Sequence, residues 1–262
     1  MRGTVAGVDD RASVDPGATI GKDVEIGPFC VVGAGVELGD SCRLISHVVL
    51  EGPTAIGPET VISPFASVGG DPQDLKYGGE DTRLEIGARN KIRECVTLNR
   101  GTPGGGGVTR IGDDNLFMAY AHVGHDCQIR DRNIFANGAT LAGHVEVGSD
   151  ATIGAYSGVH QFCRVADFAF IGGYSVVTQD ALPWVTTVGN RAKAYGLNQV
   201  GLRRRGYPAE TMRALRKAYT TLFRSKMTLT EALESVEKES GEIAEVRYFI
   251  EFVRSSERGV VR

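Results

Sequence analysis

The sequence predicts a mainly β protein, a left-handed parallel β-helix of hexapeptide repeats followed by a C-terminal α-helical domain. Two observations predict the β-helix. An aliphatic or aromatic residue recurs at every sixth position, and glycine occurs 35 times in 262 residues, about twice its usual share. A third observation predicts the helical domain, because the six-residue pattern stops at Pro183 and helical patterns follow it.

The six-residue period fits short strands joined by regular turns, since a helix would repeat about every 3.6 residues. It holds for eleven hexads from Val8 to Val68, three from Ile86 to Leu98 and twelve from Ile111 to Val177. Three hexads close one triangular coil, so residues about 18 apart should lie above one another at ~4.8 Å. The hexads therefore predict between eight and nine coils. The left-handed winding is that of the known repeat class, because the period alone does not fix it.

Two further positions of each hexad have a recurring character. Glycine often follows the aliphatic residue, and we expect it to supply positive φ at the corners. The fourth residue after the aliphatic one is small or β-branched, which suits the inside of a narrow prism. Four of the five cysteines fall at this position and are predicted to be core residues, not ligands or nucleophiles: Cys30, Cys42, Cys127 and Cys163. The odd number of cysteines without CxxC spacing indicates reduced thiols and a cytoplasmic protein.

Two segments interrupt the period, residues 69–85 and residues 99–110, and both are rich in glycine and polar residues. We expect them to leave the prism wall as loops, because functional residues often lie in loops held by a rigid scaffold. The predicted β-helix domain, including both loops, spans residues 1–187.

The predicted helical domain spans residues 188–262. Pro208 stands at a plausible first helical position before an amphipathic run, and Thr228 with Glu231 has the spacing of a capping box. Residues 243–255 form a third amphipathic run.

Composition excludes several classes of protein. The formal net charge is −3, so the overall charge does not indicate nucleic-acid binding. No window approaches the ~20 apolar residues of a membrane span, and the N-terminal residues have no apolar run typical of a signal peptide.

Stacking of coils predicts which residues share a corner of the prism. In the unbroken region His125, Gly143 and Gln161 should form one column, Asp126 and His144 a second, and His160 a third with Gly124 and Ala142. All of these are turn positions that point away from the core. One corner therefore collects three of the five histidines, and His122 adjoins it.

Four interpretations of this corner remain open from the residues alone. The side chains can be solvated turn residues, or part of a purely structural repeat protein that binds a partner along its flank. They can form a zinc site, although HxxH spacing alone is weak evidence. They can perform general-base catalysis, with Asp126 fixing the tautomer of His125 and the Gly143 amide facing a developing oxyanion.

Several segments resemble the acyl-[acyl-carrier-protein]–UDP-N-acetylglucosamine O-acyltransferase family, which performs the first step of lipid A biosynthesis. The resemblance covers nearly the whole chain, including both loops and the helical region. The matching segments are QDLKYGGE at 73–80, HVGHDC at 122–127, ANGATLAGHVEV at 136–147, VHQFC at 159–163, IGG at 171–173, GLNQVGLRRRG at 196–206 and SSERGVVR at 255–262.

The resemblance implies a role for each site residue. His125 would be the general base that deprotonates the glucosamine 3-hydroxyl for attack on the acyl thioester, Asp126 would orient it, and the Gly143 amide would stabilise the oxyanion. The other implied roles are sugar binding for Gln73, Lys76 and His144, contact with the acyl 3-hydroxyl for Asp74 and Gln161, a position near the sugar nucleotide for His160, and nucleotide or phosphate binding for Asn198, Arg204 and Arg205.

The resemblance also implies partners and an assembly. The enzyme would use an acyl carrier protein bearing a 3-hydroxyacyl thioester and UDP-N-acetylglucosamine, with no cofactor and no metal. It would be a homotrimer with active sites between adjacent prisms. Gly173 would help to set acyl-chain length and leave room for a long chain, near the 3-hydroxymyristoyl class.

Two positions depart from the family pattern. Arg191 stands where many members have histidine near the end of the acyl groove, and Val200 stands where the best-known members have glutamate near the uracil. Chain length and base recognition are therefore open. The alternatives are acylation of a 3-amino sugar nucleotide, another hexapeptide acyltransferase, or a zinc-dependent β-helix enzyme of the carbonic-anhydrase type.

Overall fold

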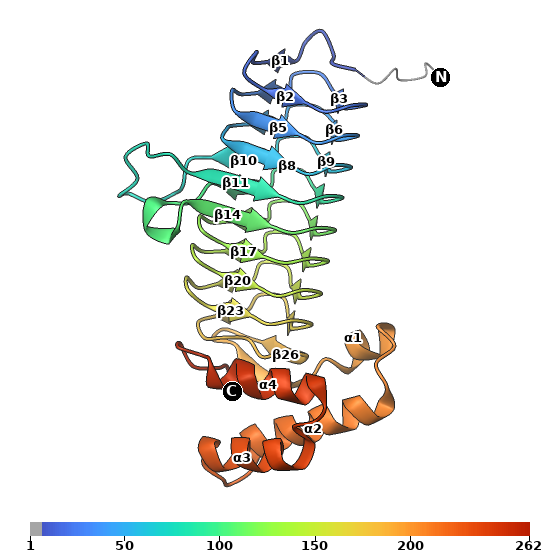
Figure 1. Ribbon diagram of the computed structural model, residues 1–262, viewed down its shortest axis with the longest axis vertical. Helices are drawn as coiled ribbons and strands as arrows, with labels where there is room; N and C mark the ends of the chain where they lie inside the picture. The colour runs from blue at the N-terminus through green and yellow to red at the C-terminus, as the bar shows by residue number, and fades with distance from the viewer. Residues whose placement is uncertain (1–6) are drawn as a thin grey trace.

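The computed structural model describes residues 7–262. Figure 1 shows a long prism of stacked coils with helices packed under its C-terminal end. The described strands form three sheets, and the winding is left-handed, as the repeat class predicts. Almost every strand pair is parallel, because each coil places its strands beside the same strands of the next coil.

The three sheets are the three faces of the prism. Sheet 1 has nine strands: β1 (Ser13–Val14), β4 (Val31–Val32), β7 (Val49–Leu50), β10 (Ser67–Gly70), β13 (Thr97–Asn99), β16 (His122–Val123), β19 (Thr140–Leu141), β22 (Gly158–Val159) and β25 (Val176–Val177). Sheet 2 has eight: β2 (Thr19–Ile20), β5 (Val36–Leu38), β8 (Thr54–Ile56), β11 (Arg83–Ile86), β14 (Val108–Ile111), β17 (Gln128–Ile129), β20 (Glu146–Val147) and β23 (Arg164–Val165). Sheet 3 has ten: β3 (Glu25–Ile26), β6 (Arg43–Leu44), β9 (Val61–Ile62), β12 (Lys91–Ile92), β15 (Leu116–Phe117), β18 (Ile134–Phe135), β21 (Thr152–Ile153), β24 (Phe170–Ile171), β26 (Val185–Val188) and β27 (Lys193–Leu197).

The strand register confirms the predicted coil length of 18 residues. His122 pairs with Thr140, and Thr140 pairs with Gly158. Across the two interruptions, paired residues lie further apart in the sequence than in the other coils. Ser67 pairs with Thr97, and Thr97 pairs with His122. The interruptions therefore lengthen two coils without breaking the sheets.

The core of the prism consists of the hexad residues and the small residues four positions after them. Phe117 and Phe135 stack inside it with ring centroids 4.6 Å apart. The four cysteines predicted to be core residues are all buried, and burial raises the pKa of each of their thiols, that of Cys127 to about 12. They are therefore packing residues, as predicted.

The predicted role of the corner glycines is wrong. Positive φ occurs mainly at the third residue after the hexad residue, and most residues there are not glycine: Asp126, His144 and Phe162 have φ of 61°, 60° and 63°. The glycines directly after the hexad residue are required for a different reason. A Cβ on Gly27 would lie 1.8 Å from the carbonyl oxygen of Ile45 in the next coil. Glycine therefore permits close stacking of coils and does not supply the left-handed backbone.

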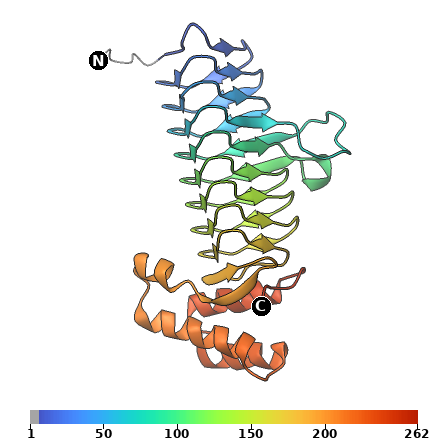
Figure 2. The same ribbon diagram turned by 180° about the vertical axis from the view of Figure 1, so that it is seen from behind.

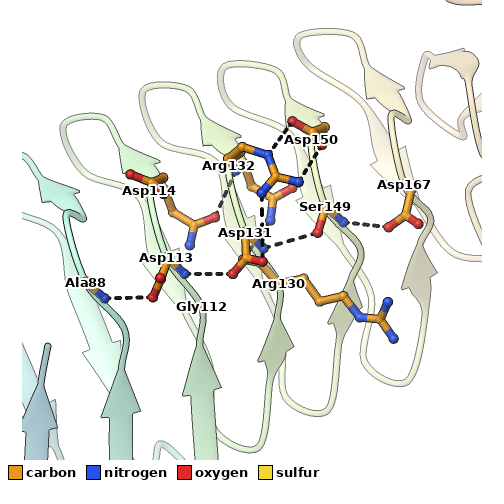
Figure 3. Close-up of polar contacts among 12 residues, drawn as sticks. Ala88, Gly112, Asp113, Asp114, Arg130, Asp131, Arg132, Ser149, Asp150 and Asp167 are labelled. Carbon is orange, nitrogen blue, oxygen red and sulfur yellow. Dashed lines mark hydrogen bonds and ion pairs between the residues drawn. The ribbon is translucent and has the colours of Figure 1, made fainter.

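We name the three corners by their side chains. The histidine corner joins sheet 1 to sheet 2 and holds residues 124–127, 142–145 and 160–163. The aspartate corner joins sheet 2 to sheet 3, and the aromatic corner joins sheet 3 to sheet 1. Figure 3 shows the aspartate corner, where backbone amides donate to side chains of the next coil, such as Asp113 N to Asp131 Oδ1 at 2.8 Å and Ser149 N to Asp167 Oδ1 at 2.6 Å. These bonds align successive coils.

Both predicted loops leave the histidine corner, but they are shorter than the sequence predicts. Strand β10 extends to Gly70 and β11 begins at Arg83, which leaves a loop of residues 71–82. Strand β13 extends to Asn99 and β14 begins at Val108, and the loop of residues 100–107 between them contains the short 3₁₀ helix η1 (Pro103–Gly105). The ends of both segments pair with neighbouring coils, which the hexad phase does not reveal.

The C-terminal region begins with a hairpin that the sequence did not predict. Strand β27 pairs antiparallel with β26, so the first helix begins later than residue 188. The helices are α1 (Gln199–Arg204), α2 (Ala209–Arg224), α3 (Leu229–Ser240) and α4 (Ala244–Arg254). The predicted capping box is confirmed, with Thr228 and Glu231 each bonding the other's backbone. None of the helices in residues 7–262 has the length and apolar character needed to cross a membrane.

Candidate functional site

His125 and Asp126 form a hydrogen-bonded pair, here named the dyad, at the histidine corner. The His125 Nδ1 lies 2.7 Å from the Asp126 Oδ2. The His125 side chain is 14% exposed and that of Asp126 is 0% exposed, so only the histidine faces solvent. With Asp126 ionised, Nδ1 donates to the carboxylate, and Nε2 is left with a lone pair that can accept a proton.

The loop of residues 100–107 covers Asp126. Thr102 donates twice to this carboxylate, from its backbone N to Oδ1 at 2.8 Å and from its hydroxyl to Oδ2 at 2.6 Å. The Asp126 backbone N donates to the Thr109 hydroxyl at 2.7 Å. Both Asp126 oxygens therefore have donors, which a buried carboxylate needs.

Gly143 lies against the His125 ring, one coil further along. A Cβ at this position would stand 2.5 Å from His125 Cε1 and 2.6 Å from Nε2. Glycine is therefore needed to let the ring lie over the backbone. The Gly143 N donates to no acceptor within residues 7–262, so this amide is available to an oxyanion beside His125.

His144 lies between the dyad and Phe162, with its ring stacked on that of Phe162 and edge-on to that of His125. Its Nε2 lies 3.6 Å from Asp126 Oδ2, and its ring centroid is 5.0 Å from that of His125 and 4.5 Å from that of Phe162. Burial lowers the pKa of His144 below its usual value, and the negative charge of Asp126 only partly opposes this effect. His144 is therefore suited to act as a neutral hydrogen-bonding group near pH 7.

His122 lies on β16 beside this corner. Its Nδ1 is 2.7 Å from the hydroxyl of Thr97. Burial, and after it the charge of His125, lowers the pKa of His122. His122 therefore adjoins the histidine corner, as the stacking of coils predicts.

The loop of residues 71–82 carries three predicted substrate residues. The Asp74 carboxylate accepts from the Lys76 backbone N at 2.9 Å, which closes a turn, and Asp74 is half-buried. Gln73 and Lys76 are exposed. The charge of Asp74 acts on His144 and raises its pKa slightly, so this loop lies near the dyad.

The exposed pair His160 and Gln161 lies two coils after His125 at the same corner. The His160 Nδ1 is 3.1 Å from the Gln161 carbonyl oxygen. The structure thus brings the predicted loop residues, the dyad, Gly143, His144 and this pair to one corner.

The predicted nucleotide residues lie elsewhere in the chain, in helix α1 and at its two caps. Figures 1 and 2 show α1 on the opposite side of the prism from the two loops. Asn198 caps α1 by accepting from the Gly201 N at 3.0 Å. Arg205 bonds Asp150 at the aspartate corner, with 2.6 Å from Nη1 to Oδ1. Arg204 is exposed and forms no ion pair within the described residues.

The two residues expected to affect chain length are also away from the dyad. Gly173 is exposed at the aromatic corner, and the nearest atom to a Cβ there would be the Ala155 carbonyl oxygen at 3.3 Å. Arg191 is exposed in the turn between β26 and β27. Val200 is 61% exposed in α1.

A groove begins beside the dyad and follows the outer face of sheet 2. A volume of about 850 Å³ is lined by Asp126, His144 and Phe162 and reaches Arg258. It shares Arg110, Gln128 and Arg164 with a second volume of about 940 Å³ that extends to helix α4. One side of the dyad is therefore open to a long ligand.

The dyad and His144 also meet the distance requirement for a metal site. Ligand atoms of His125, Asp126 and His144 all lie within 4.8 Å of one another. However, the 2.7 Å between His125 Nδ1 and Asp126 Oδ2 is a direct hydrogen bond, and a tetrahedral zinc ion with Zn–ligand distances of ~2.0–2.2 Å would hold its ligand atoms further apart than this. The contacts fit a general base better than a zinc centre.

Sequence reasoning missed Thr102 and Thr109. Both contact Asp126, but Thr102 lies in an interruption, where the hexad phase predicts no neighbour. The cluster of glycines around Thr102 is a signal of close packing that could have indicated this contact. A Cβ on Gly105, for example, would lie 2.0 Å from Asp126 Cγ.

Two family models match the chain. Residues 180–261 match the model described as UDP N-acetylglucosamine O-acyltransferase, domain 2. Residues 17–52 and 109–143 match the model described as bacterial transferase hexapeptide (six repeats).

Curated relatives and solved structures resemble the chain over nearly its full length. An acyl-[acyl-carrier-protein]–UDP-N-acetylglucosamine O-acyltransferase of Alkalilimnicola ehrlichii is 48% identical over 97% of this chain and 99% of its own. One from Thermodesulfovibrio yellowstonii is 49% identical over the same shares. The UDP-N-acetylglucosamine O-acyltransferase structure from Moraxella catarrhalis has a TM-score of 0.95 and 43% identity over 97% of this chain and 99% of its own.

Proposed function

Because the chain belongs to the acyl-[acyl-carrier-protein]–UDP-N-acetylglucosamine O-acyltransferase family, we propose that it acylates the 3-position of UDP-N-acetylglucosamine with a 3-hydroxyacyl chain from acyl carrier protein. This reaction is the first step of lipid A biosynthesis. The chain is an acyltransferase, and the observation that supports our mechanism best is the His125–Asp126 pair with the Gly143 amide beside it.

The contacts support a general-base mechanism. His125 Nε2 takes the proton of the sugar 3-hydroxyl as its oxygen attacks the thioester carbonyl, and Asp126 stabilises the resulting imidazolium through Nδ1. The Gly143 N–H donates to the oxyanion of the tetrahedral intermediate. When the intermediate collapses, the carbon–sulfur bond breaks and His125 returns the proton to the leaving thiolate. The products are the sugar ester and the free carrier thiol.

The surrounding side chains support the substrate roles. His144 is neutral near pH 7 and can hold the sugar, together with Gln73, Lys76 and His160. Asp74 and Gln161 would hold the acyl 3-hydroxyl. Arg205, with Arg204 and Asn198 beside it, would bind the nucleotide, because a guanidinium fork fits a diphosphate.

We propose a homotrimer with the active sites between subunits. In one chain the dyad lies at the histidine corner, whereas Arg205 lies at the aspartate corner and Gly173 at the aromatic corner. A single convex edge also makes no deep cleft. A neighbouring prism would supply the missing wall and the remaining substrate residues, and acyl length would be measured along Gly173 and Arg191.

We also propose a division into residues 1–187 and 188–262, with the second part contributing to carrier docking. Arg203, Arg213 and Arg216 surround a volume of about 340 Å³ on its surface. Such a cluster suits an acidic carrier protein. The five free cysteines support function in the reducing cytoplasm.

An acyl-transfer assay tests the proposal. The purified protein is given carrier thioesters of several chain lengths and either the hydroxyl or the amino sugar nucleotide. We expect transfer to the hydroxyl sugar, and a fall in kcat of about 10³-fold or more in His125→Ala with the assembly unchanged. Arg205→Ala should raise the KM for the nucleotide and leave kcat nearly unchanged.

Three results would contradict this scheme. A His125→Ala variant that retains most activity would remove the general base. Transfer only to the amino sugar would identify the alternative acceptor. Stoichiometric zinc in active protein, with loss of activity on chelation, would favour a metal enzyme built on His125, Asp126 and His144.

A further inference from the structure

We propose that the segment Arg100–Thr102 is a positioning element that holds the loop of residues 71–82 and the Asp126 carboxylate in one fixed arrangement. The inference rests on the proposed function and adds residues that the family resemblance did not single out. Arg100 fixes the base of the loop, and Thr102 fixes Asp126. Only one residue separates these two anchors, so the loop and the dyad share a single support.

Arg100 is a buried cation with an almost complete set of acceptors. Its side chain is 9% exposed. Nη1 donates to the carbonyl oxygens of Gly52 at 2.9 Å and Gly69 at 2.7 Å. Nη2 bonds the Asp71 carboxylate and lies 3.3 Å from the Tyr77 hydroxyl. A buried guanidinium is retained only where such partners compensate its lost hydration.

The contacts of Arg100 hold both ends of the segment that carries the predicted substrate residues. Asp71 precedes Gln73 and Asp74, and Tyr77 follows Lys76. Asn99 adds a bond from its Nδ2 to the Asp71 carbonyl oxygen at 2.6 Å. Residues 73–76, of which only Asp74 is half-buried, are thus held between two anchored points. Leu75 at this turn is fully exposed, so its side chain makes little contact with the prism.

Thr102 holds the Asp126 carboxylate in place. It is buried and makes two hydrogen bonds to Asp126, one to each carboxylate oxygen. The Oδ2 that accepts from the Thr102 hydroxyl is the same oxygen that accepts from His125 Nδ1. The threonine hydroxyl therefore fixes the direction in which Asp126 presents this oxygen to the histidine.

The glycines of the segment allow this close contact. A Cβ on Gly101 would lie 2.3 Å from the Val108 N and 2.8 Å from Asp126 Oδ1. A Cβ on Gly105 would lie within the Asp126 carboxylate, 2.3 Å from each oxygen. The segment therefore packs directly on the carboxylate and leaves no gap for water between them.

The first experiment separates positioning from folding at Thr102. In Thr102→Val the hydroxyl is lost and the shape is kept, and we expect kcat to fall about 10- to 100-fold with both KM values nearly unchanged. Thr102→Ser should restore most of the activity. Thr140→Val, an exposed threonine on β19, serves as the matched control. Equal melting temperatures across the set would show that the fold is retained.

The second experiment concerns Arg100. Asp71→Asn removes its anionic partner at an exposed side chain, and Arg100→Met removes the cation. Both should raise the KM for the 3-hydroxyacyl donor about tenfold, reduce the preference over a donor without the hydroxyl, and leave kcat within a few-fold. Hydrogen exchange of the amides of residues 71–82 should become faster in both. Arg43→Met, a surface cation paired with Glu25, is the control.

The outcomes are distinguishable. If the wild type transfers acyl groups and Thr102→Val matches it, or if Thr102→Ser is as impaired as Thr102→Val, the positioning role of Thr102 is refuted. Unchanged donor KM and unchanged exchange in Asp71→Asn and Arg100→Met refute the role of Arg100. If the wild type is inactive with every donor, the proposed function fails, whereas faster loop exchange in the variants would still support the anchor.

Discussion

Two histidines beside the dyad are partly buried. The pKa values of His122 and His144 are lowered because both rings are partly buried, and the charge of His125 adds to the effect at each. Two neutral rings beside His125 avoid a cluster of positive charges in the state that accepts a proton.

The lowered pKa of His122 makes stability depend on pH. The unfolded chain takes up the proton near pH 6.5, whereas the folded chain resists it to a lower pH. The resulting loss of stability of the folded state is absent at pH 7.5 and grows as the pH falls through 6.5 toward the pKa of His122 in the folded chain. We expect His122→Asn to lose less melting temperature than the wild type between pH 7.5 and 5.5.

Thermal unfolding at several pH values checks this prediction. Thr19→Val, at an exposed position on β2 in another sheet, changes no titratable group and should keep the wild-type slope. If His122→Asn and the wild type have the same slope, the buried neutral ring makes no contribution.

At the residue scale, the sequence was informative wherever the period is unbroken. Stacking by 18 brought Gly143 and His144 beside His125 and Asp126, as the geometry confirms. The partners of Asp126 in the loop, above all Thr102, could not be predicted in this way. Their position depends on how an aperiodic segment folds back, and no residue spacing encodes that path.

Within each hexad, glycine and the residue with the left-handed backbone conformation occupy different positions. Glycine stands where the next coil passes closely, and polar or aromatic residues accept the positive φ two positions later. The αL conformation costs a non-glycine residue roughly 1–2 kcal/mol. Corner hydrogen bonds, such as those of Asp126, and ring stacking, such as that of Tyr156 on Tyr174, help to offset this cost.

Two glycines with contrasting surroundings test this account. Gly27→Ala would place a methyl group 1.8 Å from the Ile45 carbonyl oxygen, and we expect a loss of several kcal/mol or failure to fold. Gly158→Ala meets nothing within 4 Å and should be neutral or slightly stabilising. Chemical denaturation measures both. Equal stability of the two variants would contradict close stacking as the reason for glycine.

Elements with a sequence period or cap were predictable, and the others were not. The capping box of α3 and the start of α2 after Pro208 agree with the pattern. Strand β27 has no such signal, and the only one for helix α1 is its N-cap Asn198. Helix α1 is six residues long, and β27 is fixed by pairing with β26 across a hairpin. Tertiary contacts decide both elements.

In the whole molecule, the aromatic corner exposes a column of aromatic side chains. Tyr120, Tyr156 and Tyr174 at the aromatic corner are 67%, 62% and 73% exposed, and the rings of Tyr156 and Tyr174 stack at 5.3 Å. Exposed aromatic residues in a column are typical of a protein interface. This corner also carries Gly173, so its burial by a neighbour would complete the proposed acyl groove.

Light scattering coupled to gel filtration tests the assembly. We expect a mass three times the 28.0 kDa of the chain. The double variant Tyr156→Lys and Tyr174→Lys should dissociate it and lose activity, while Met227→Lys, an exposed apolar residue in the helical part, should not. A monomeric wild type with full activity would refute the intersubunit site.

The register of the coils also sets the order in which the chain can fold during synthesis. Each strand finds its partner about one coil away, so coils can form one after another as the chain leaves the ribosome. The last coil is an exception. Asp180 exchanges backbone hydrogen bonds with Gly259 and Val261, so this part of the coil waits for a segment made about eighty residues later. Until then the growing prism keeps open strand edges, and translation speed through the helices becomes a determinant of how long they stay open.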